Sequence, residues 1–249
     1  MGWLKEKYTR NYFLQRDANG MPTKYGVYGI EYWENNDIYP EAKALIDALS
    51  INGSKILDIG FGRGETIRYC IAKGAAKVVG VDFSSDALDI AKSITLKPIS
   101  SCRYILICDD IADFINRWPK DDTFDHIIMC DVIEHIPRSE VGKLLPQLFQ
   151  LLAPGGTLVI HTPFYPEDDD VLTTGGKSVC KDSSDDFEET KGMHINRYSY
   201  HSLGVQLDRY GFKRWAPCIF LRPCNLIPIW LGPLKRMHGL ARFLGYKIG

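Results

Sequence analysis

The stretch KILDIGFGRGE, residues 55–65, constrains the fold of this chain more than any other part of the sequence. A short apolar run is followed by glycines at every second position, Gly60, Gly62 and Gly64. Glycine allows a sharp turn and a close approach of the backbone to a ligand. A helix over about residues 65–72 would point its first amide groups back at the same place. The stretch therefore predicts a strand, a ligand-binding turn and a helix.

Strand-like and helix-like segments alternate along the rest of the chain. The predicted strands cover residues 55–59, 77–81, 103–108, 124–130, 157–162 and about 212–221. The predicted helices cover residues 40–49, 65–72, 85–94, 111–117, 139–152 and 199–210. Strands that alternate with helices are typical of parallel sheets. We expect an α/β, Rossmann-like, doubly wound and mostly parallel sheet of seven or six strands, with helices on both faces.

The segments outside this alternation complete a predicted single domain, residues 1–249. It divides into an N-terminal cap with one helix (1–53), a cofactor-binding core (54–162), an acidic loop or lid (163–191), the end of the core (192–222) and a basic C-terminal extension (223–249). The cap shows no clean period. Its aromatic residues are expected to pack on the core rather than line a pocket: Tyr25, Tyr28, Tyr32 and Trp33. The extension reads as a basic amphipathic helix.

Composition narrows the class of protein. The chain is 45% apolar and 24% charged with a net charge of −1, which is ordinary for a globular protein and gives no overall attraction to nucleic acid. Its seven cysteines show no C-x-x-C pair and no metal-ligand spacing, so we expect a reducing cytoplasm and no metal site. The acidic run 167–170 is interpreted as solvated rather than as a divalent-ion site. Peripheral membrane contact through the basic tail is the less favoured interpretation of that segment.

Acidic residues recur at the ends of the predicted strands. Asp58 lies within the first strand, and Asp82, the pair Asp109-Asp110 and Asp131 follow the next three. Each could simply cap a helix, but the repetition favours a ligand at the carboxyl edge of the sheet. Asp82 stands 22 residues after Gly60, where a carboxylate can accept both ribose hydroxyls. The adjacent pair could accept from an adenine amine, so the pattern predicts an adenosine ligand.

A dinucleotide is the main rival ligand. Its G-x-G-x-x-G fingerprint requires a third glycine where this chain has Glu65. A carboxylate beside a pyrophosphate is unfavourable, whereas it suits a ligand with an ammonium or sulfonium group. An NAD(P)-dependent oxidoreductase and a non-catalytic adenosine-binding module remain as alternatives.

Five ordered motifs define a resemblance: LDIGFGRGET, VVGVDFS, ICDDIADF, FDHIIMCDVIEHI and LLAPGGTLVIHTP. Together they resemble class I S-adenosylmethionine-dependent methyltransferases, closest to the broad small-molecule subgroup, over roughly residues 55–212. Phe61 is a small departure, because the family often has Cys or Ala there.

The resemblance implies positions around the methyl donor S-adenosylmethionine, whose product is S-adenosylhomocysteine. Gly60, Phe61, Gly62 and Gly64 would lie under the methionine part, with Asp58 ordering the turn. Asp82 would bind the ribose hydroxyls, with Phe83 against the adenine and Ser84 as a further cofactor-binding residue. Asp110, or else Asp109, would meet the adenine amine next to Ile111. The backbone of Met129 or Cys130 would face the methionine amino end, and Asp131 would be a further cofactor-binding residue.

Three histidines are candidates for the catalytic group: His135, His161 and His194. Methyl transfer uses an activated donor, so the protein has mainly to position the acceptor and guide one proton. Histidine is the natural base near neutral pH. His194 is the preferred candidate, because the MHINRYS segment resembles a substrate-side histidine segment in relatives.

We therefore predict an enzyme that methylates an O or N atom of a small molecule or carrier-bound metabolite, with a glycan or natural-product pathway as a weaker indication. It would act as a monomer or homodimer.

Overall fold

The computed structural model describes residues 6–14, 29–100, 103–164, 195–196, 198, 200–221 and 239–246. The chain forms two compact units, Met1–Ile128 and Met129–Gly249, and each is considered by itself. The sequence-based division into five segments stays a prediction.

The first unit is built on three parallel strands in the order β3-β2-β1. These strands are β1 (Lys55–Ile59), β2 (Lys77–Asp82) and β3 (Tyr104–Cys108). Residues of β1 and β2 are buried on both faces, as expected for strands that helices cover on both sides. The parallel register places Asp58 opposite Gly80.

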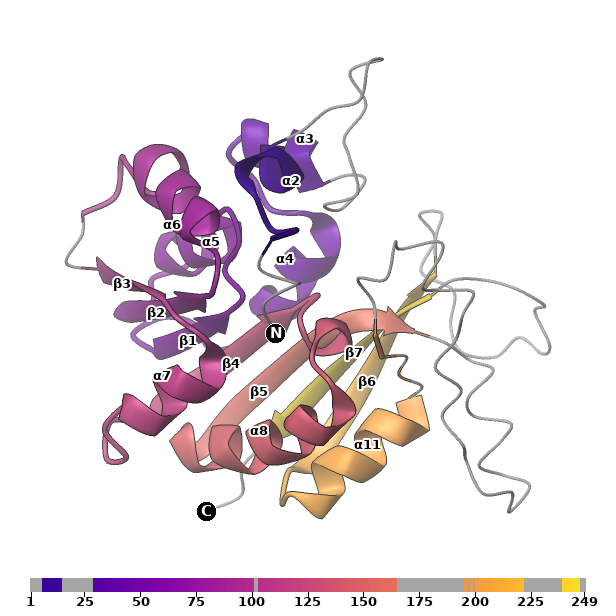
Figure 1. The fold of residues 1–249 in the computed structure, drawn as a ribbon. Helices are drawn as coiled ribbons and strands as arrows, with labels where there is room; N and C mark the ends of the chain where they lie inside the picture. Colours follow the sequence, from indigo (N-terminus) through magenta and orange to yellow (C-terminus); the bar gives the residue numbers. More distant parts are fainter. Residues whose placement is uncertain are drawn as a thin grey trace. The chain divides into compact units, whose positions relative to one another are not determined.

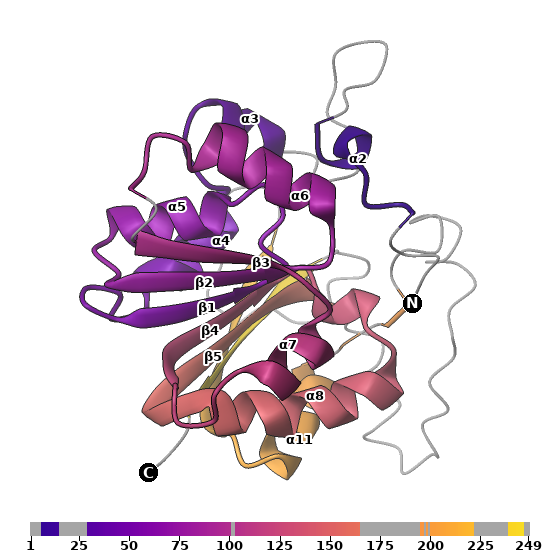
Figure 2. The same cartoon turned by 60° about the vertical axis from the view of Figure 1, so that its left-hand side comes forward.

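Helices cover both faces of these strands. They are α4 (Pro40–Asp47), α5 (Glu65–Ala72), α6 (Ser85–Ile90), its π-helical continuation η1 (Ala91–Thr95) and α7 (Ile111–Arg117). Figure 2 shows α4, α5 and α6 on one face and α7 on the other. Alternating parallel strands and crossover helices thus bring the ends of β1, β2 and β3 to one edge of the sheet, where the glycine turn begins.

The N-terminal cap is more regular than predicted. It contains two short helices, α2 (Arg10–Leu14) and α3 (Gly29–Glu34). Helices of one or two turns are too short to show a hydrophobic period, so no pattern in the sequence indicates them. Tertiary contacts hold them in place: Phe13 is buried, and the Trp33 indole Nε1 donates to Thr95 Oγ1 at 2.7 Å. Trp33 therefore packs on the core, as expected, whereas Tyr25 and Tyr28 lie outside the described residues.

The second unit contains β5 (Leu152–Phe164), β6 (Lys213–Leu221) and β7 (Gly239–Tyr246), with β7 antiparallel to both neighbours. Its helices are α8 (Arg138–Leu151), α11 (Tyr200–Arg209) and the short 3-10 turn η3 (Ile133–His135). In Figure 1, α8 and α11 lie on the same side of these strands. The strand β4 (Phe124–Cys130) spans the boundary between the units.

The full strand order is β3-β2-β1-β4-β5-β7-β6. The predicted doubly wound, mostly parallel α/β class is confirmed, with seven strands.

The predicted C-terminal helix is wrong for residues 239–246, which form β7. The run LARFLGY is apolar and short, and such a run cannot be assigned to helix or strand by its period alone. Here it pairs with two strands, so its backbone groups are satisfied by long-range partners that lie far from it in sequence. The rest of the extension, and the acidic segment from residue 165 to Thr190, lie outside the described residues.

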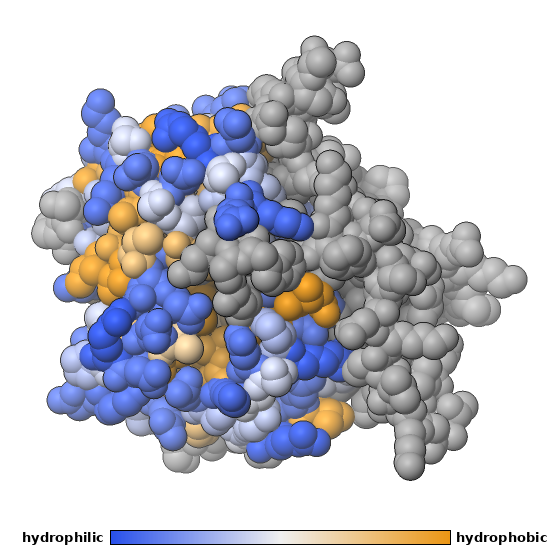
Figure 3. Space-filling view, in the orientation of Figure 1, coloured by the Kyte–Doolittle hydropathy of each residue, from blue (hydrophilic) through white to orange (hydrophobic). Residues whose placement is uncertain are grey.

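No helix in the described ranges is long and apolar enough to cross a membrane. The face of the molecule in Figure 3 is mostly hydrophilic where it is described, with separate hydrophobic patches. Exposed large hydrophobic side chains include Ile94 and Val205, each 43% exposed. Isolated apolar side chains of this kind are usual on protein surfaces.

Candidate active site

The glycine turn after β1 adopts a backbone that only glycine tolerates well. Gly60, Gly62 and Gly64 have φ angles of 71°, 51° and 85°, in the left-handed region. Gly64 also begins α5, and a Cβ placed on it would lie 3.1 Å from the Cβ of Ala91. The turn is therefore held close to η1, and the start of α5 faces the space above it.

Asp82 at the end of β2 accepts hydrogen bonds from the glycine turn and from the loop that follows β2. Its Oδ2 accepts from the backbone N–H of Gly62 at 2.9 Å, and its Oδ1 accepts from that of Ser84 at 2.8 Å. Each carboxylate oxygen keeps a second acceptor position, so the group can still receive two vicinal hydroxyl donors. Burial raises the pKa of Asp82 to about 6, against the lowering effect of these two hydrogen bonds.

This pKa predicts a pH-dependent affinity for an adenosine ligand. Above about pH 6 the Asp82 carboxylate is ionised and accepts from the ribose hydroxyls; below it the group gains a proton and loses an acceptor site. Affinity for S-adenosylhomocysteine should be flat above pH 7 and fall about tenfold per pH unit below 6, the slope for one proton. Calorimetric titration from pH 5 to 8, with circular dichroism to confirm folding, measures this. The same slope in Asp82→Asn would assign the effect to another group.

Asp58 lies two residues before Gly60 and is fully enclosed. Its Oδ2 is buried without a hydrogen-bond partner. Burial, followed by the neighbouring Asp82 and Glu65, raises its pKa well above the usual value. A buried carboxyl oxygen beside the glycine turn is an acceptor that a ligand's ammonium group could satisfy. This orphaned atom and the open positions on Asp82 fit an amino-acid-bearing nucleoside.

Two side chains of the turn point away from a ligand. Phe61 is 3% exposed, and a Cβ on Gly80 would lie 2.9 Å from its ring, so Phe61 fills the core and offers only its backbone. Glu65 forms a buried ion pair with Arg63. Because Arg63 neutralises that charge, Glu65 alone does not exclude a pyrophosphate. Arg63 carried no signal in the sequence, since the turn motif leaves its position open.

The segments after β2 and β3 contain the other residues that are predicted to contact the donor. Ser84 caps α6, and half-buried Phe83 lies near the Tyr8 ring, with 5.1 Å between the ring centroids. Asp110 caps α7 by accepting from Ala112 N at 2.9 Å. Asp110 therefore does cap a helix, as considered for each of these aspartates, and the cap uses only one of its two carboxylate oxygens. Asp109 forms an ion pair with Arg117. Ile111, the first residue of α7, is half-buried.

In the second unit, Asp131 and His161 form a pair where β4 ends. Asp131 Oδ1 lies 2.8 Å from His161 Nδ1, and the Asp131 N–H donates to the His161 carbonyl at 2.9 Å. Asp131 has a φ of 55°, which is rare for a residue other than glycine and is often found at functional sites. The His161 side chain is 2% exposed and that of Asp131 is 45% exposed. The buried imidazole thus holds an accessible carboxylate. Met129 just before it is buried, and Cys130 is half-buried.

Glu134 anchors the chain that returns to this unit. Its carbonyl accepts from the N–H groups of Ile195 and Asn196, at 2.9 and 3.0 Å. Its own carboxyl accepts from Thr162 Oγ1 at 3.0 Å, and burial, with the charge of Asp131, raises its pKa well above the usual value. His135 follows in η3 and is half-buried. His194 lies outside the described residues, but its neighbour Ile195 is fixed beside Glu134.

No group of three or more His, Cys, Asp or Glu side chains in the described part of the chain has the arrangement of a metal site.

Comparison with known proteins places this geometry in a family. A family model described as "Methyltransferase domain" matches residues 32–216. The ubiquinone biosynthesis O-methyltransferase of Dechloromonas aromatica (strain RCB) is 27% identical over 228 residues, 88% of this chain and 90% of that protein. The phosphoethanolamine N-methyltransferase of Plasmodium falciparum (isolate 3D7) is 28% identical over 134 residues, 54% of this chain and 48% of that protein.

Solved structures share the fold. The phosphoethanolamine N-methyltransferase 2 of Haemonchus contortus, in complex with phosphomonomethylethanolamine and S-adenosylhomocysteine, has a TM-score of 0.64 and 18% identity, covering 97% of this chain and 61% of that one. The magnesium protoporphyrin IX methyltransferase of Synechocystis PCC 6803, with bound S-adenosylhomocysteine, has a TM-score of 0.61 and 13% identity, covering 99% and 98%.

The chain belongs to the class I S-adenosylmethionine-dependent methyltransferases. S-Adenosylmethionine is its methyl donor, and its function is the methylation of a small molecule.

Proposed function

We propose that this methyltransferase transfers the methyl group to an O or N atom of an acceptor that carries a hydroxyl or amine proton, either free or attached to a carrier. The observation that carries the proposal is the Asp131–His161 pair. It presents an ionisable and accessible carboxylate, which is held by a buried imidazole, at the end of β4. The relatives named as a ubiquinone biosynthesis O-methyltransferase and a phosphoethanolamine N-methyltransferase support an O or N acceptor.

The chemistry asks little of the protein beyond positioning. When bound, S-adenosylmethionine supplies a methyl group on a positively charged sulfur, which is already activated for displacement. Unit 1 would hold the donor through Asp82, the glycine turn and Asp58. In the second unit, Asp131 would accept the proton that a hydroxyl or amine of the acceptor gives up. His161 would keep the carboxylate in the orientation that the left-handed backbone of Asp131 defines.

A screen of acceptors tests the proposal. The protein is incubated with methyl-labelled S-adenosylmethionine and small phenols, catechols, amines, phosphoethanolamine and thiols. We expect S-adenosylhomocysteine to form in equal amount to a methylated product, with the label on oxygen or nitrogen. Label found on carbon or sulfur, or transferred only to protein or nucleic acid, would contradict the proposed acceptor class.

A cytoplasmic location is part of the proposal. It is supported by Cys70, a buried free thiol, as expected in a reducing compartment.

A further inference from the structure

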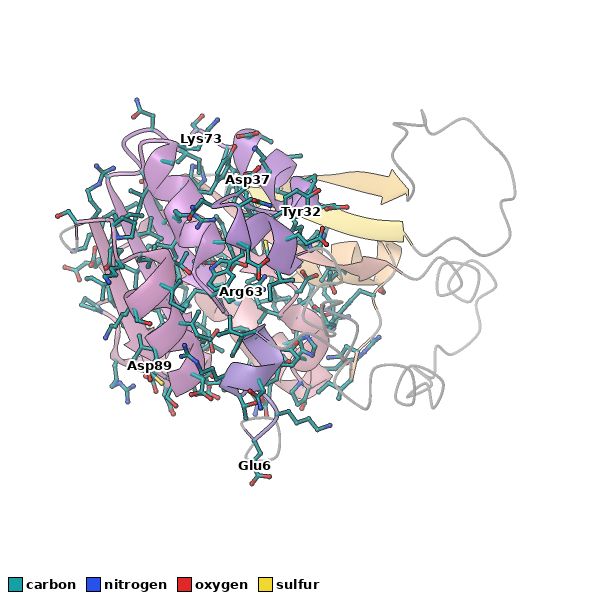
Figure 4. All side chains as sticks on the ribbon, turned by 90° about the horizontal axis from the view of Figure 1, so that it is seen from above. Glu6, Tyr32, Asp37, Arg63, Lys73 and Asp89 are labelled. Atoms are coloured by element: carbon teal, nitrogen blue, oxygen red, sulfur yellow. The ribbon has the colours of Figure 1, made fainter. Side chains whose placement is uncertain are left out.

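Arg63 occupies an unusual place for an arginine. It lies in the middle of the glycine turn, and at 1% exposure it is among the largest fully buried side chains of the described chain. In Figure 4 it lies near the middle of the view, whereas Glu6 and Lys73 lie at the edge. Its Nε and Nη2 atoms lie 2.7 and 2.6 Å from Glu65 Oε1. A buried arginine requires compensation of this kind, because its charge cannot be removed at physiological pH.

The same guanidinium also reaches the two short helices of the N-terminal cap, α2 and α3. Its Nη1 donates to the carbonyl of Phe13, in α2, at 3.3 Å. Its central carbon lies 5.4 Å from the centre of the Trp33 ring, in α3, within the range of a cation–π contact. The planar fork of arginine allows these contacts to be made at once, which the single ammonium of lysine could not do. One side chain therefore joins the glycine turn to two segments that lie far from it in sequence.

The segment Glu6–Leu14 is fastened a second time, next to the ribose-binding carboxylate. Ser84 Oγ donates to the Tyr8 carbonyl at 2.7 Å, and the Tyr8 ring meets the Phe83 ring edge-on. The N–H of Arg10 donates to Asp86 Oδ2, also at 2.7 Å. The segment is thus attached at both parts of the donor site, the glycine turn and the loop after Asp82.

We propose that Arg63 is a positioning residue that fastens the segment Glu6–Leu14 to the glycine turn, so that docking of this segment and donor binding stabilise each other. The inference rests on the assignment of the donor to this site. A docked segment orders the turn and Phe83 before the donor arrives, which lowers the entropy lost on binding. By linkage, a bound donor must stabilise the docked segment to the same extent.

The test compares the wild type with R63M/E65Q, which removes both charges of the buried pair at once. Replacing Arg63 alone would leave Glu65 as an unpaired buried charge, and replacing Glu65 alone would do the same to Arg63, so either single change would destabilise the fold. Hydrogen exchange of residues 6–14 is measured by mass spectrometry without ligand and with S-adenosylhomocysteine, and affinity is measured by calorimetry.

We expect exchange of residues 6–14 to be about tenfold faster in R63M/E65Q than in the wild type, and the Kd for S-adenosylhomocysteine to be about tenfold higher, as for typical coupling between sites. In the wild type, the ligand should slow exchange in the same segment. Equal exchange in the two proteins would overturn the fastening role. Faster exchange with unchanged affinity would overturn the coupling.

A second variant, Y8A, separates loss of the fastening from a general folding defect. Y8A removes the contact with Phe83 on the half-buried surface of the segment and leaves the buried pair intact. It should change exchange and affinity in the same direction, and wild-type values for both would contradict the proposal. Neither readout needs an acceptor, so failure of the proposed acceptor class would leave this test unaffected. If the wild type bound no S-adenosylhomocysteine, the donor assignment itself would fail, while ligand-free exchange would still test the fastening.

Discussion

Replacing Asp82 by alanine is expected to raise the Kd for S-adenosylmethionine about 100-fold. Two hydroxyl hydrogen bonds to a charged acceptor contribute about 3 kcal/mol together at the lower end of their range, which corresponds to two powers of ten in affinity. The substitution also leaves the N–H groups of Gly62 and Ser84 without the acceptor that now orders the turn. Calorimetric titration gives the affinity directly.

The matched control is Asp89→Ala, which changes an exposed aspartate on α6, the helix that follows Asp82 in the chain (Figure 4). It should bind the donor as the wild type does. A change of less than about threefold in Asp82→Ala would mean that the ribose is held elsewhere, because a lost charge-assisted hydrogen bond costs more than that.

Replacing Asp131 by alanine is expected to lower kcat about 100-fold and to leave the donor Kd within about threefold, since general-base catalysis contributes factors of 10² to 10⁴. Asp131 is accessible and is fixed by His161, so the loss should appear in the chemical step. Single-turnover measurement of S-adenosylhomocysteine formation, at saturating donor and with the acceptor found by screening, isolates that step.

The comparison with His194→Ala makes this test decisive. The sequence favours His194 as the base, whereas the geometry of the second unit favours the carboxylate that His161 holds. If Asp131→Ala turns over normally and His194→Ala does not, the base is His194 and the Asp131–His161 pair is structural. Asp125→Ala is a useful control, because Asp125 is exposed on β4 and accepts from the backbone N–H of Lys55.

The sequence predicts those elements whose local residue pattern agrees with their place in the fold. Helix α5 and strands β1 and β4 fall within the predicted bounds, because glycine turns, strand-end acids and apolar runs are local signals. The aspartates at the strand ends were predictable in the same way. The capping role of Asp110 shows that one carboxylate can satisfy both interpretations.

The unpredictable part depends on contacts between distant segments. β7 is a strand because it pairs with β5 and β6, and the hydrophobic pattern of its own residues does not indicate this pairing. α2 and α3 are held by Arg63 and Thr95, so they are helices because of where they dock. The Asp131–His161 contact joins residues 30 positions apart, and neither motif alone indicates it.

The measurement that tests the donor site most directly is calorimetric titration of the wild-type protein with S-adenosylmethionine, S-adenosylhomocysteine and NAD under one set of conditions. We expect both S-adenosyl ligands to bind one per chain and NAD not to bind. Binding of NAD without binding of either S-adenosyl compound would contradict the assignment of the glycine turn and Asp82 to a sulfonium donor.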